Sequence, residues 1–167
     1  IARAAVMTDV TESDFHELFA TNVGGCYFTS QAAIPEMIGA GGGKIINISS
    51  ISALKGLAGQ ANYASSKAGV IALTKVVARE FGGKNVCCNA IAPGFFVTNQ
   101  NRALLFTEDG TPTARSAKIL NGTPMGRFVD SSELLGGTLF LCDDKSASAI
   151  TGVVLPIDGG FSAYSGV

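Results

Sequence analysis

The stretch Gly43-Lys44-Ile45-Ile46-Asn47-Ile48-Ser49-Ser50 decides the fold. A short apolar run behind glycines is typical of a buried strand in a parallel sheet, and Ser50 stands where this strand ends. From Asn62 the pattern becomes helical, with Ala, Lys and Leu and, apart from the single Gly69, no helix breaker before Gly82. The sequence therefore predicts a strand, a loop and a long helix, with a site at the carboxyl end of the strand.

Two side chains of the predicted helix suit proton transfer. Tyr63 and Lys67 are four residues apart and therefore lie on the same helix face. A tyrosine phenol has a pKa of about 10, and an adjacent cation lowers that pKa towards neutral pH. Ser50 could hydrogen-bond the oxygen of a carbonyl or alcohol against the Tyr63 hydroxyl, so that a proton moves while a hydride moves elsewhere. This arrangement predicts the interconversion of a carbonyl and an alcohol.

The remaining chain continues the alternation of helices and strands. Residues 11–14 have the form of a helix cap and open a long helical pattern. Residues 86–91 predict the next strand, and residues 152–156 predict a last strand whose proline suits a sheet edge. Because strand–helix–strand units cross over with one hand, we expect the three strands to be parallel and to be neighbours in sequence order, with helices covering the sheet.

Four motifs together resemble the short-chain dehydrogenase/reductase family. They are Thr21-Asn22-Val23-Gly24-Gly25, Ser50 ahead of the helix, Tyr63-Ala64-Ser65-Ser66-Lys67 within it, and Asn89-Ala90-Ile91-Ala92-Pro93-Gly94 after it. The resemblance runs from Thr8 to the C-terminus. It implies an α/β fold with a doubly wound parallel sheet of the Rossmann type in a single domain, of which residues 1–167 form the C-terminal part.

The resemblance implies a role for each of four catalytic residues. Ser50 would polarise the substrate oxygen and Tyr63 would act as the acid and base. Lys67 would bind the nicotinamide ribose and lower the pKa of Tyr63. Asn22 would hold a water in the proton relay, and the two glycines beside it would loosen the helix there.

The resemblance also implies a nicotinamide cofactor, NAD or NADP. Its contacts would fall on Tyr63, Lys67, Pro93, Gly94, Phe96 and Thr98. A complete dinucleotide-binding fold has, in addition, a first strand, a glycine-rich turn at a helix N-terminus and a residue that selects the ribose. None of these is in the sequence, so we expect the N-terminal dinucleotide-binding half to be missing from it. The sequence therefore does not distinguish NAD from NADP.

Residues 95–123 form a long excursion that in the family is the substrate lid. A lid for acyl chains should be mostly apolar, whereas this one carries amides and arginines that suit hydroxyls and a carboxylate. The alternative is that these arginines are surface charges. The substrate-binding residues are expected to be Ser50, Asn99, Asn101 and Arg102, with Gln100 and Arg115 as further polar residues of the lid.

Three functions stay open at this point. Residues 94–128 and residues 158–167 resemble the D-mannonate oxidoreductase (fructuronate reductase) branch of the family, which implies NAD(P)-dependent chemistry on a keto or hydroxyl group of a sugar acid. The stretch Gly59-Gln60-Ala61-Asn62-Tyr63 favours a 3-oxoacyl-carrier-protein reductase instead. The third alternative is an inactive fragment with a structural or assembly role. For the parent protein, the family implies a homodimer or homotetramer.

Composition limits the class of protein and its partners. The 167 residues are 47% apolar and 15% charged, which is typical of one globular domain. The net charge is −1 and the basic residues are scattered, so we expect neither nucleic acid nor a membrane as a partner. The four cysteines lack zinc-site spacing, so we expect no metal site and four reduced thiols in a cytoplasmic protein: Cys26, Cys87, Cys88 and Cys142.

Overall fold

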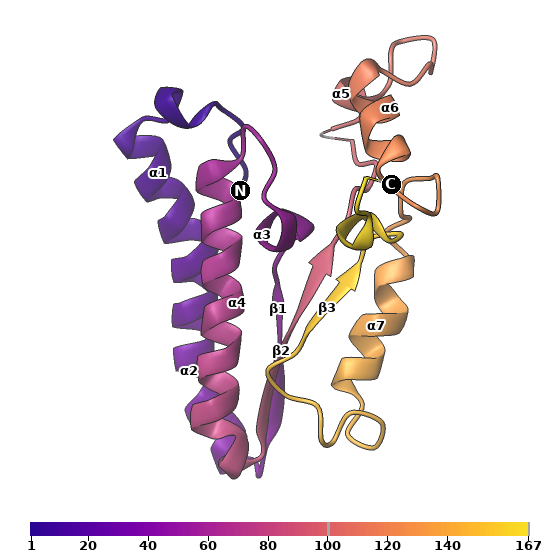
Figure 1. Ribbon diagram of the computed structural model, residues 1–167. Helices are drawn as coiled ribbons and strands as arrows, with labels where there is room; N and C mark the ends of the chain where they lie inside the picture. Colours follow the sequence, from indigo (N-terminus) through magenta and orange to yellow (C-terminus); the bar gives the residue numbers. More distant parts are fainter. Residues whose placement is uncertain (100, 167) are drawn as a thin grey trace.

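A three-stranded parallel sheet forms the centre of the computed structural model, which describes residues 1–99 and 101–166. The strands are β1 (Gly43–Ile48), β2 (Val86–Pro93) and β3 (Val154–Ile157), and their order in the sheet is β1-β2-β3. Both pairings are parallel, and all three strands point towards the top of Figure 1. The predicted strand order and direction are therefore confirmed, although β3 begins two residues later than expected.

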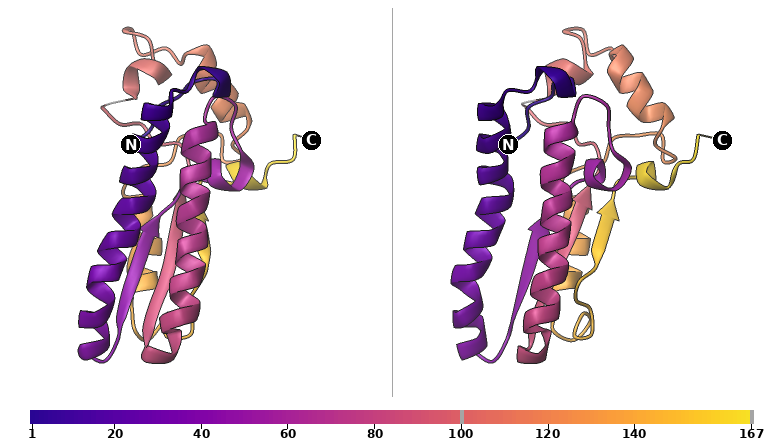
Figure 2. Two further views of the ribbon diagram at one scale, coloured as in Figure 1. Left: turned by 90° about the vertical axis from the view of Figure 1, so that its left-hand side faces the viewer. Right: turned by 60° about the vertical axis from the view of Figure 1, so that its left-hand side comes forward.

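Helices cover both faces of the sheet. Figure 2 shows α2 and α4 side by side on one face and α7 on the other, while α5 and α6 stand beyond the carboxyl ends of the strands. Because both faces are covered, every residue of β2 up to Ala92 is buried. The helices are α1 (Glu12–Phe19), α2 (Gly25–Gly39), α3 (Ile51–Lys55), α4 (Ala61–Phe81), α5 (Arg102–Leu105), α6 (Ala114–Asn121) and α7 (Glu133–Cys142), and the short 3-10 turns are η1 (Met7–Asp9), η3 (Gly82–Lys84) and η4 (Phe161–Ala163).

The predicted first helix is a single rod with a local change of winding. Thr11 caps it as expected, because its hydroxyl oxygen accepts the amide hydrogen of Asp14 at 3.1 Å. Between α1 and α2, residues Ala20–Gly24 (η2) form a π-helical turn. Such a turn inserts one extra residue into the helix and is often found at functional sites. Asn22 lies inside it, where the sequence breaks local helix preference.

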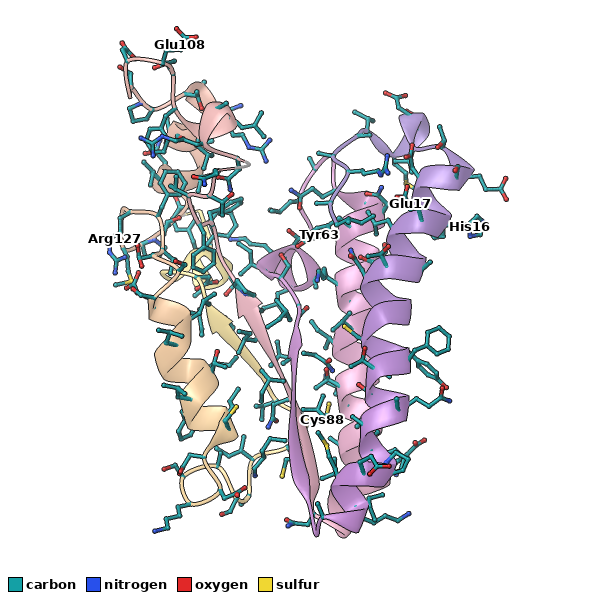
Figure 3. All side chains as sticks on the ribbon, turned by 180° about the vertical axis from the view of Figure 1, so that it is seen from behind. His16, Glu17, Tyr63, Cys88, Glu108 and Arg127 are labelled. Atoms are coloured by element: carbon teal, nitrogen blue, oxygen red, sulfur yellow. The ribbon has the colours of Figure 1, made fainter. Side chains whose placement is uncertain are left out.

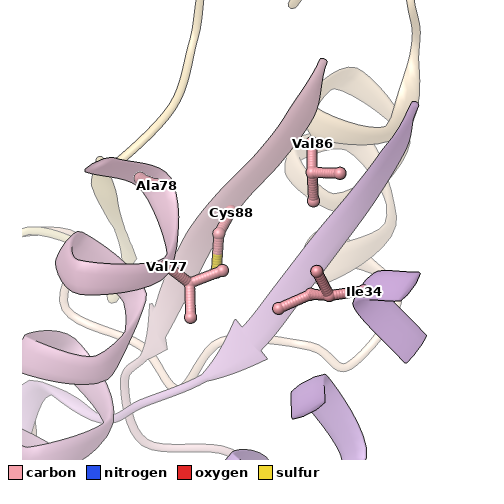
Figure 4. Packing of buried hydrophobic residues seen from close by; sticks show 5 residues of the cluster. All are labelled: Ile34, Val77, Ala78, Val86 and Cys88. Atoms are coloured by element: carbon pink, nitrogen blue, oxygen red, sulfur yellow. The ribbon is translucent and has the colours of Figure 1, made fainter. Parts of the chain in front are cut away.

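Hydrophobic residues of α2, α4 and β2 pack into a core cluster on the face of the sheet that α2 and α4 cover. Cys88 projects towards α4, whereas the Cys87 sulfur lies 3.4 Å from the Lys44 ammonium on the other face, so the two adjacent thiols point in opposite directions. All four cysteines are unpaired. Figure 4 shows the cluster, which consists of Ile34, Val77, Ala78, Val86 and Cys88.

The two outer strands of the sheet differ in how their edges are protected. β3 carries Pro156, whose missing N–H suits an edge. β1 pairs with β2 alone among the described residues, so its other edge is unpaired within them. No helix within residues 1–99 and 101–166 is long and apolar enough to cross a membrane.

Candidate active site

Ser50 stands between β1 and α3. Its backbone is extended, and its side-chain oxygen caps α3 by accepting the amide hydrogen of Ser52 at 3.1 Å. The side chain is 8% exposed. A hydroxyl that accepts one bond still has its own hydrogen to donate. Ser50 is therefore held at the carboxyl end of β1 with a hydroxyl hydrogen that can still be donated.

Tyr63 and Lys67 share one face of α4, as predicted from their spacing. The Lys67 ammonium lies 5.9 Å from the centroid of the Tyr63 ring, within the range at which a cation and an aromatic face attract each other. Figure 3 shows Tyr63 near the upper end of β1, where α3 also lies. The structure thus brings the phenol and the ammonium to the strand end that carries Ser50.

Lys67 also makes a contact that the sequence did not predict. Its ammonium donates to the backbone oxygen of Ile48, the last residue of β1, at 2.9 Å. Burial lowers the pKa of Lys67, and the nearby Cys26 thiol opposes this shift. Lys67, Cys26 and Ile48 all line a cavity of about 490 Å³ between α2 and the free edge of β1.

Asn22 is buried, and its side-chain nitrogen is engaged by the protein. This nitrogen donates to the Ser66 hydroxyl at 3.1 Å and to the Ile1 carbonyl at 2.9 Å. Ser66 in turn donates to the Tyr63 carbonyl at 2.8 Å. This role of Ser66 was not predicted from the sequence, although its place three residues after Tyr63 allows the backbone contact. A water-holding role for Asn22 stays a prediction.

The predicted cofactor segment follows β2 and lies against β3. The Gly94 amide donates to the Ile157 carbonyl at 2.9 Å. A Cβ at Gly94 would come 2.6 Å from the Asp158 Cα, so only glycine fits there. Phe96 continues the segment by pairing with Val129 as an isolated bridge. Pro93, Gly94 and Phe96 thus lie in one ordered segment beside the end of the sheet.

The predicted substrate residues of the lid differ in what they contact. Asn101 bonds within its own loop: its side-chain oxygen accepts the Thr98 amide at 2.8 Å, and its side-chain nitrogen donates to the Phe96 carbonyl at 2.8 Å. Arg102 is exposed and lies 5.6 Å from the Phe106 ring centroid. Asn99 is exposed as well, and Gln100 lies outside the described residues. Substrate contacts by these side chains stay predictions.

The described residues contain no group of three or more His, Cys, Asp or Glu side chains that could hold a metal ion. The chemistry that the site offers is instead that of hydroxyls, a phenol and an ammonium. Such donors suit the hydroxyl groups of a ribose and the oxygen of a carbonyl.

Comparison with known proteins identifies the family. A family model described as enoyl-(acyl carrier protein) reductase matches residues 1–162. The chain belongs to the short-chain dehydrogenase/reductase family. The doubly wound α/β class predicted from the sequence is thereby confirmed.

Individual relatives support this assignment. An uncharacterized oxidoreductase of Haemophilus influenzae is 48% identical over 159 residues, which are 95% of this chain and 56% of the relative. A 3-oxoacyl-[acyl-carrier-protein] reductase of Chlamydia trachomatis is 41% identical, over 97% of this chain and 62% of the relative. A crystal structure with bound NAD, of a protein from Haemophilus influenzae described as a D-mannonate oxidoreductase, superposes with a TM-score of 0.92 at 47% identity, over 97% of this chain and 58% of that one. The chain thus spans less than two thirds of the length of each of these relatives.

Proposed function

We propose that this chain supplies the catalytic part of an NAD(P)-dependent oxidoreductase that interconverts a keto and a hydroxyl group on a sugar acid. The observation that carries the proposal is the place of the Lys67 ammonium, 5.9 Å from the Tyr63 ring and 2.9 Å from the carbonyl of Ile48, the last residue of the strand that leads to Ser50. The nicotinamide, when bound, exchanges a hydride with the substrate carbon. In the reductive direction Tyr63 gives its phenolic proton to the carbonyl oxygen, which Ser50 holds by a hydrogen bond.

Lys67 supports this proton transfer in two ways. Its positive charge lies 5.9 Å from the Tyr63 ring, where it stabilises the negative charge that develops on the phenol oxygen during proton transfer. Its ammonium has three hydrogens, of which the Ile48 carbonyl takes one, so two can reach ribose hydroxyls of the cofactor. The donors at this strand end therefore fit the nicotinamide half of NAD or NADP, and Pro93, Gly94, Phe96 and Thr98 would line the same half. We propose that the pyrophosphate and adenosine are held by a part of the family domain that precedes these residues.

The polar side chains of the lid favour a sugar acid over an acyl chain as the substrate. Asn99, Arg102 and Arg115 are exposed on it, and an arginine beside an amide suits a carboxylate beside hydroxyls. The NAD-bound relative described as a D-mannonate oxidoreductase favours the same class. The 41% identity to a 3-oxoacyl-[acyl-carrier-protein] reductase keeps that activity as the second candidate.

A pair of assays decides between the two activities. A full-length protein containing this chain is given NADH or NADPH with fructuronate, and separately with an acetoacetyl thioester. We expect oxidation of the cofactor with fructuronate. A higher kcat/KM with the thioester favours the 3-oxoacyl-carrier-protein reductase activity instead. Inactivity with both substrates contradicts both activities.

We further propose that the parent protein is a cytoplasmic homodimer or homotetramer that assembles through α2 and α4. An apolar groove of about 570 Å³ runs between these helices, and the exposed side chains Tyr27, Phe28 and Val76 lie on them. Val76→Glu should shift the sedimentation coefficient towards that of the monomer. Lys75→Glu, one residue away, should leave it unchanged; equal behaviour of both variants contradicts this interface.

A function of another class is a fragment that assembles without catalysis. The observation in its favour is that the chain spans 56% of its Haemophilus influenzae relative. The intact mass of the natural protein and calorimetry with NAD and NADP test it. A mass of 17.1 kDa with no cofactor binding supports the fragment, whereas a larger mass with cofactor binding supports the enzyme.

A further inference from the structure

Lys55, the last residue of α3, ties the Ser50 helix to the C-terminal segment. Its ammonium donates to the carbonyl oxygen of Phe161 at 3.0 Å and to that of Tyr164 at 2.5 Å. It also lies 5.1 Å from the ring centroid of Phe161 and 5.6 Å from that of Tyr164. Two carbonyls and two aromatic rings thus surround one ammonium, an arrangement that binds a cation through both charge and the ring faces. We call Lys55, Phe161 and Tyr164 the tail clasp.

The clasp reaches two other parts of the candidate site through Phe161. The Phe161 ring packs edge to face on Phe95, with centroids 5.1 Å apart, and Phe95 directly follows Gly94. On another side it lies against Gly122 at the end of α6, where a Cβ would come 3.2 Å from the Phe161 ring. One side chain therefore connects the Ser50 helix, the predicted cofactor segment and the lid.

The turn that presents Phe161 is itself held in one shape. Asp158 is 7% exposed, and its carboxylate accepts the amide hydrogens of Gly160 at 2.9 Å and Ser162 at 2.8 Å. Burial acts to raise the pKa of Asp158, but these hydrogen bonds outweigh it and lower the pKa. Gly160 has φ +88°, a conformation that favours glycine. The clasp thus rests on an ordered turn.

We propose that Lys55 is a positioning residue that acts through Ser50: the tail clasp fixes the orientation of α3, and with it the Ser50 hydroxyl, relative to the Gly94–Phe95 backbone and the lid. The five residues of α3 are too few for a stable isolated helix. Its orientation therefore depends on tertiary contacts. Buried Ile51 and the bond from the Ser52 hydroxyl to Gln60 hold its first turn, and Lys55 holds its last residue. The catalytic consequence rests on the proposed function, because a misplaced hydrogen-bond donor costs rate only if Ser50 holds the substrate oxygen.

Hydrogen exchange on the 167-residue chain tests whether the tail clasp fixes the orientation of α3. In Lys55→Met, the Ser52 amide, which donates to Ser50, and the Tyr164 amide in the tail should both exchange about threefold to tenfold faster, since exposed charge-assisted bonds are lost. Lys55→Arg, which keeps the charge, should restore the native rates. Lys84→Met is the matched control, because the Lys84 ammonium also lies over a ring, 5.7 Å from the Phe81 centroid, at the opposite end of α4. Unchanged Ser52 exchange in Lys55→Met overturns the proposal.

Kinetics test the catalytic part in the full-length protein. Lys55→Met should lower kcat with the keto substrate by about tenfold to 10²-fold and leave the Kd for the nicotinamide cofactor unchanged, with Lys55→Arg close to wild type. A purely structural role would instead lower Tm and weaken cofactor and substrate binding alike, and that outcome overturns the positioning role. If wild type turns over no substrate, the proposed function fails, and the exchange experiment still decides whether the clasp controls Ser50.

Discussion

Two regions of the molecule use polar side chains in opposite ways: the layer formed by β1, α4 and the helical rod of α1, η2 and α2, and the lid formed by residues 95–123. In the first layer, which we call the platform, polar side chains turn inward and bond across elements. Asn22 reaches Ser66, 44 positions away along the chain, and Asn47 donates to Thr74 at 2.9 Å. All four of these side chains are at most 6% exposed. The platform therefore holds its catalytic candidates by contacts that exist only when the whole layer is folded.

The lid bonds mainly within itself. Thr98 and Asn101 exchange hydrogen bonds across three residues, and Thr107 bonds to Asp109 and Thr111 in the next turn. Asn99 and Arg102 remain exposed. Under the proposed function, the platform would hold the catalytic side chains by long-range contacts, and the lid would offer exposed side chains on a locally determined backbone.

The largest expected effect comes from removing the proposed proton donor of the platform. In the full-length enzyme, Tyr63→Phe should lower kcat by on the order of 10²–10⁴-fold with little change in cofactor Kd, because it removes the transferred proton and little packing. Ser65→Ala, at an exposed position on the same helix, is the control and should keep full activity. Retained turnover in Tyr63→Phe would make Tyr63 a packing residue.

The next largest effect is expected on stability, and it compares a buried leucine of the platform with one of the lid. Leu18 in the platform is 0% exposed and Leu105 in the lid is 3% exposed. Leu18→Ala should lower the free energy of unfolding of the whole chain by about 2–5 kcal/mol, as measured by urea denaturation, and Leu18→Met by less than about 1.5 kcal/mol. Leu105→Ala should mainly speed hydrogen exchange within residues 101–121. A global loss in Leu105→Ala as large as in Leu18→Ala would show that lid and platform unfold as one unit.

A smaller effect tests the buried hydrogen bonds of the platform directly. Ser66→Ala removes the acceptor of the Asn22 side-chain nitrogen and should cost about 1–3 kcal/mol of unfolding free energy, because a buried donor loses its partner. Ser65→Ala, at the exposed neighbouring position, should be nearly neutral. Equal stabilities of the two variants would mean that the Asn22–Ser66 contact contributes nothing.

The smallest effect is expected outside both regions, at the exposed ion pair between Arg127, which follows the lid, and Glu133, the first residue of α7. The two terminal nitrogens of the guanidinium donate to the carboxylate at 2.7 Å, and this lowers the pKa of Glu133 from 4.5 to about 2. A lowered carboxyl pKa adds stability that is complete above pH 4.5 and is lost as the pH falls towards 2. Thermal unfolding between pH 2 and 6 should show a shallower acid loss for Glu133→Gln. Identical profiles would mean that the pair is screened by solvent.

Local pattern was enough to predict the elements that carry the site. The apolar run before Ser50 predicted β1, and the helical pattern from Asn62 predicted α4 to within one residue of its start. The four-residue spacing of Tyr63 and Lys67 fixed their shared face, because helix geometry is the same in any protein. Strand order followed from the handedness of crossovers. Resemblance to a family, confirmed by comparison, supplied the class of chemistry.

The tertiary structure alone decided how those side chains are held. The contact of Lys67 with the Ile48 carbonyl, the bond from Asn22 to Ser66, and the clasp of Lys55 on the tail join residues that are 19 to 109 positions apart. The lowered pKa of Lys67 comes from burial, which depends on what packs over the side chain. Sequence periodicity describes which way a residue faces within its own helix or strand. It carries no information on what another element, folded from a distant part of the chain, places opposite that face, and for this reason the exact partners of the site residues required the folded structure.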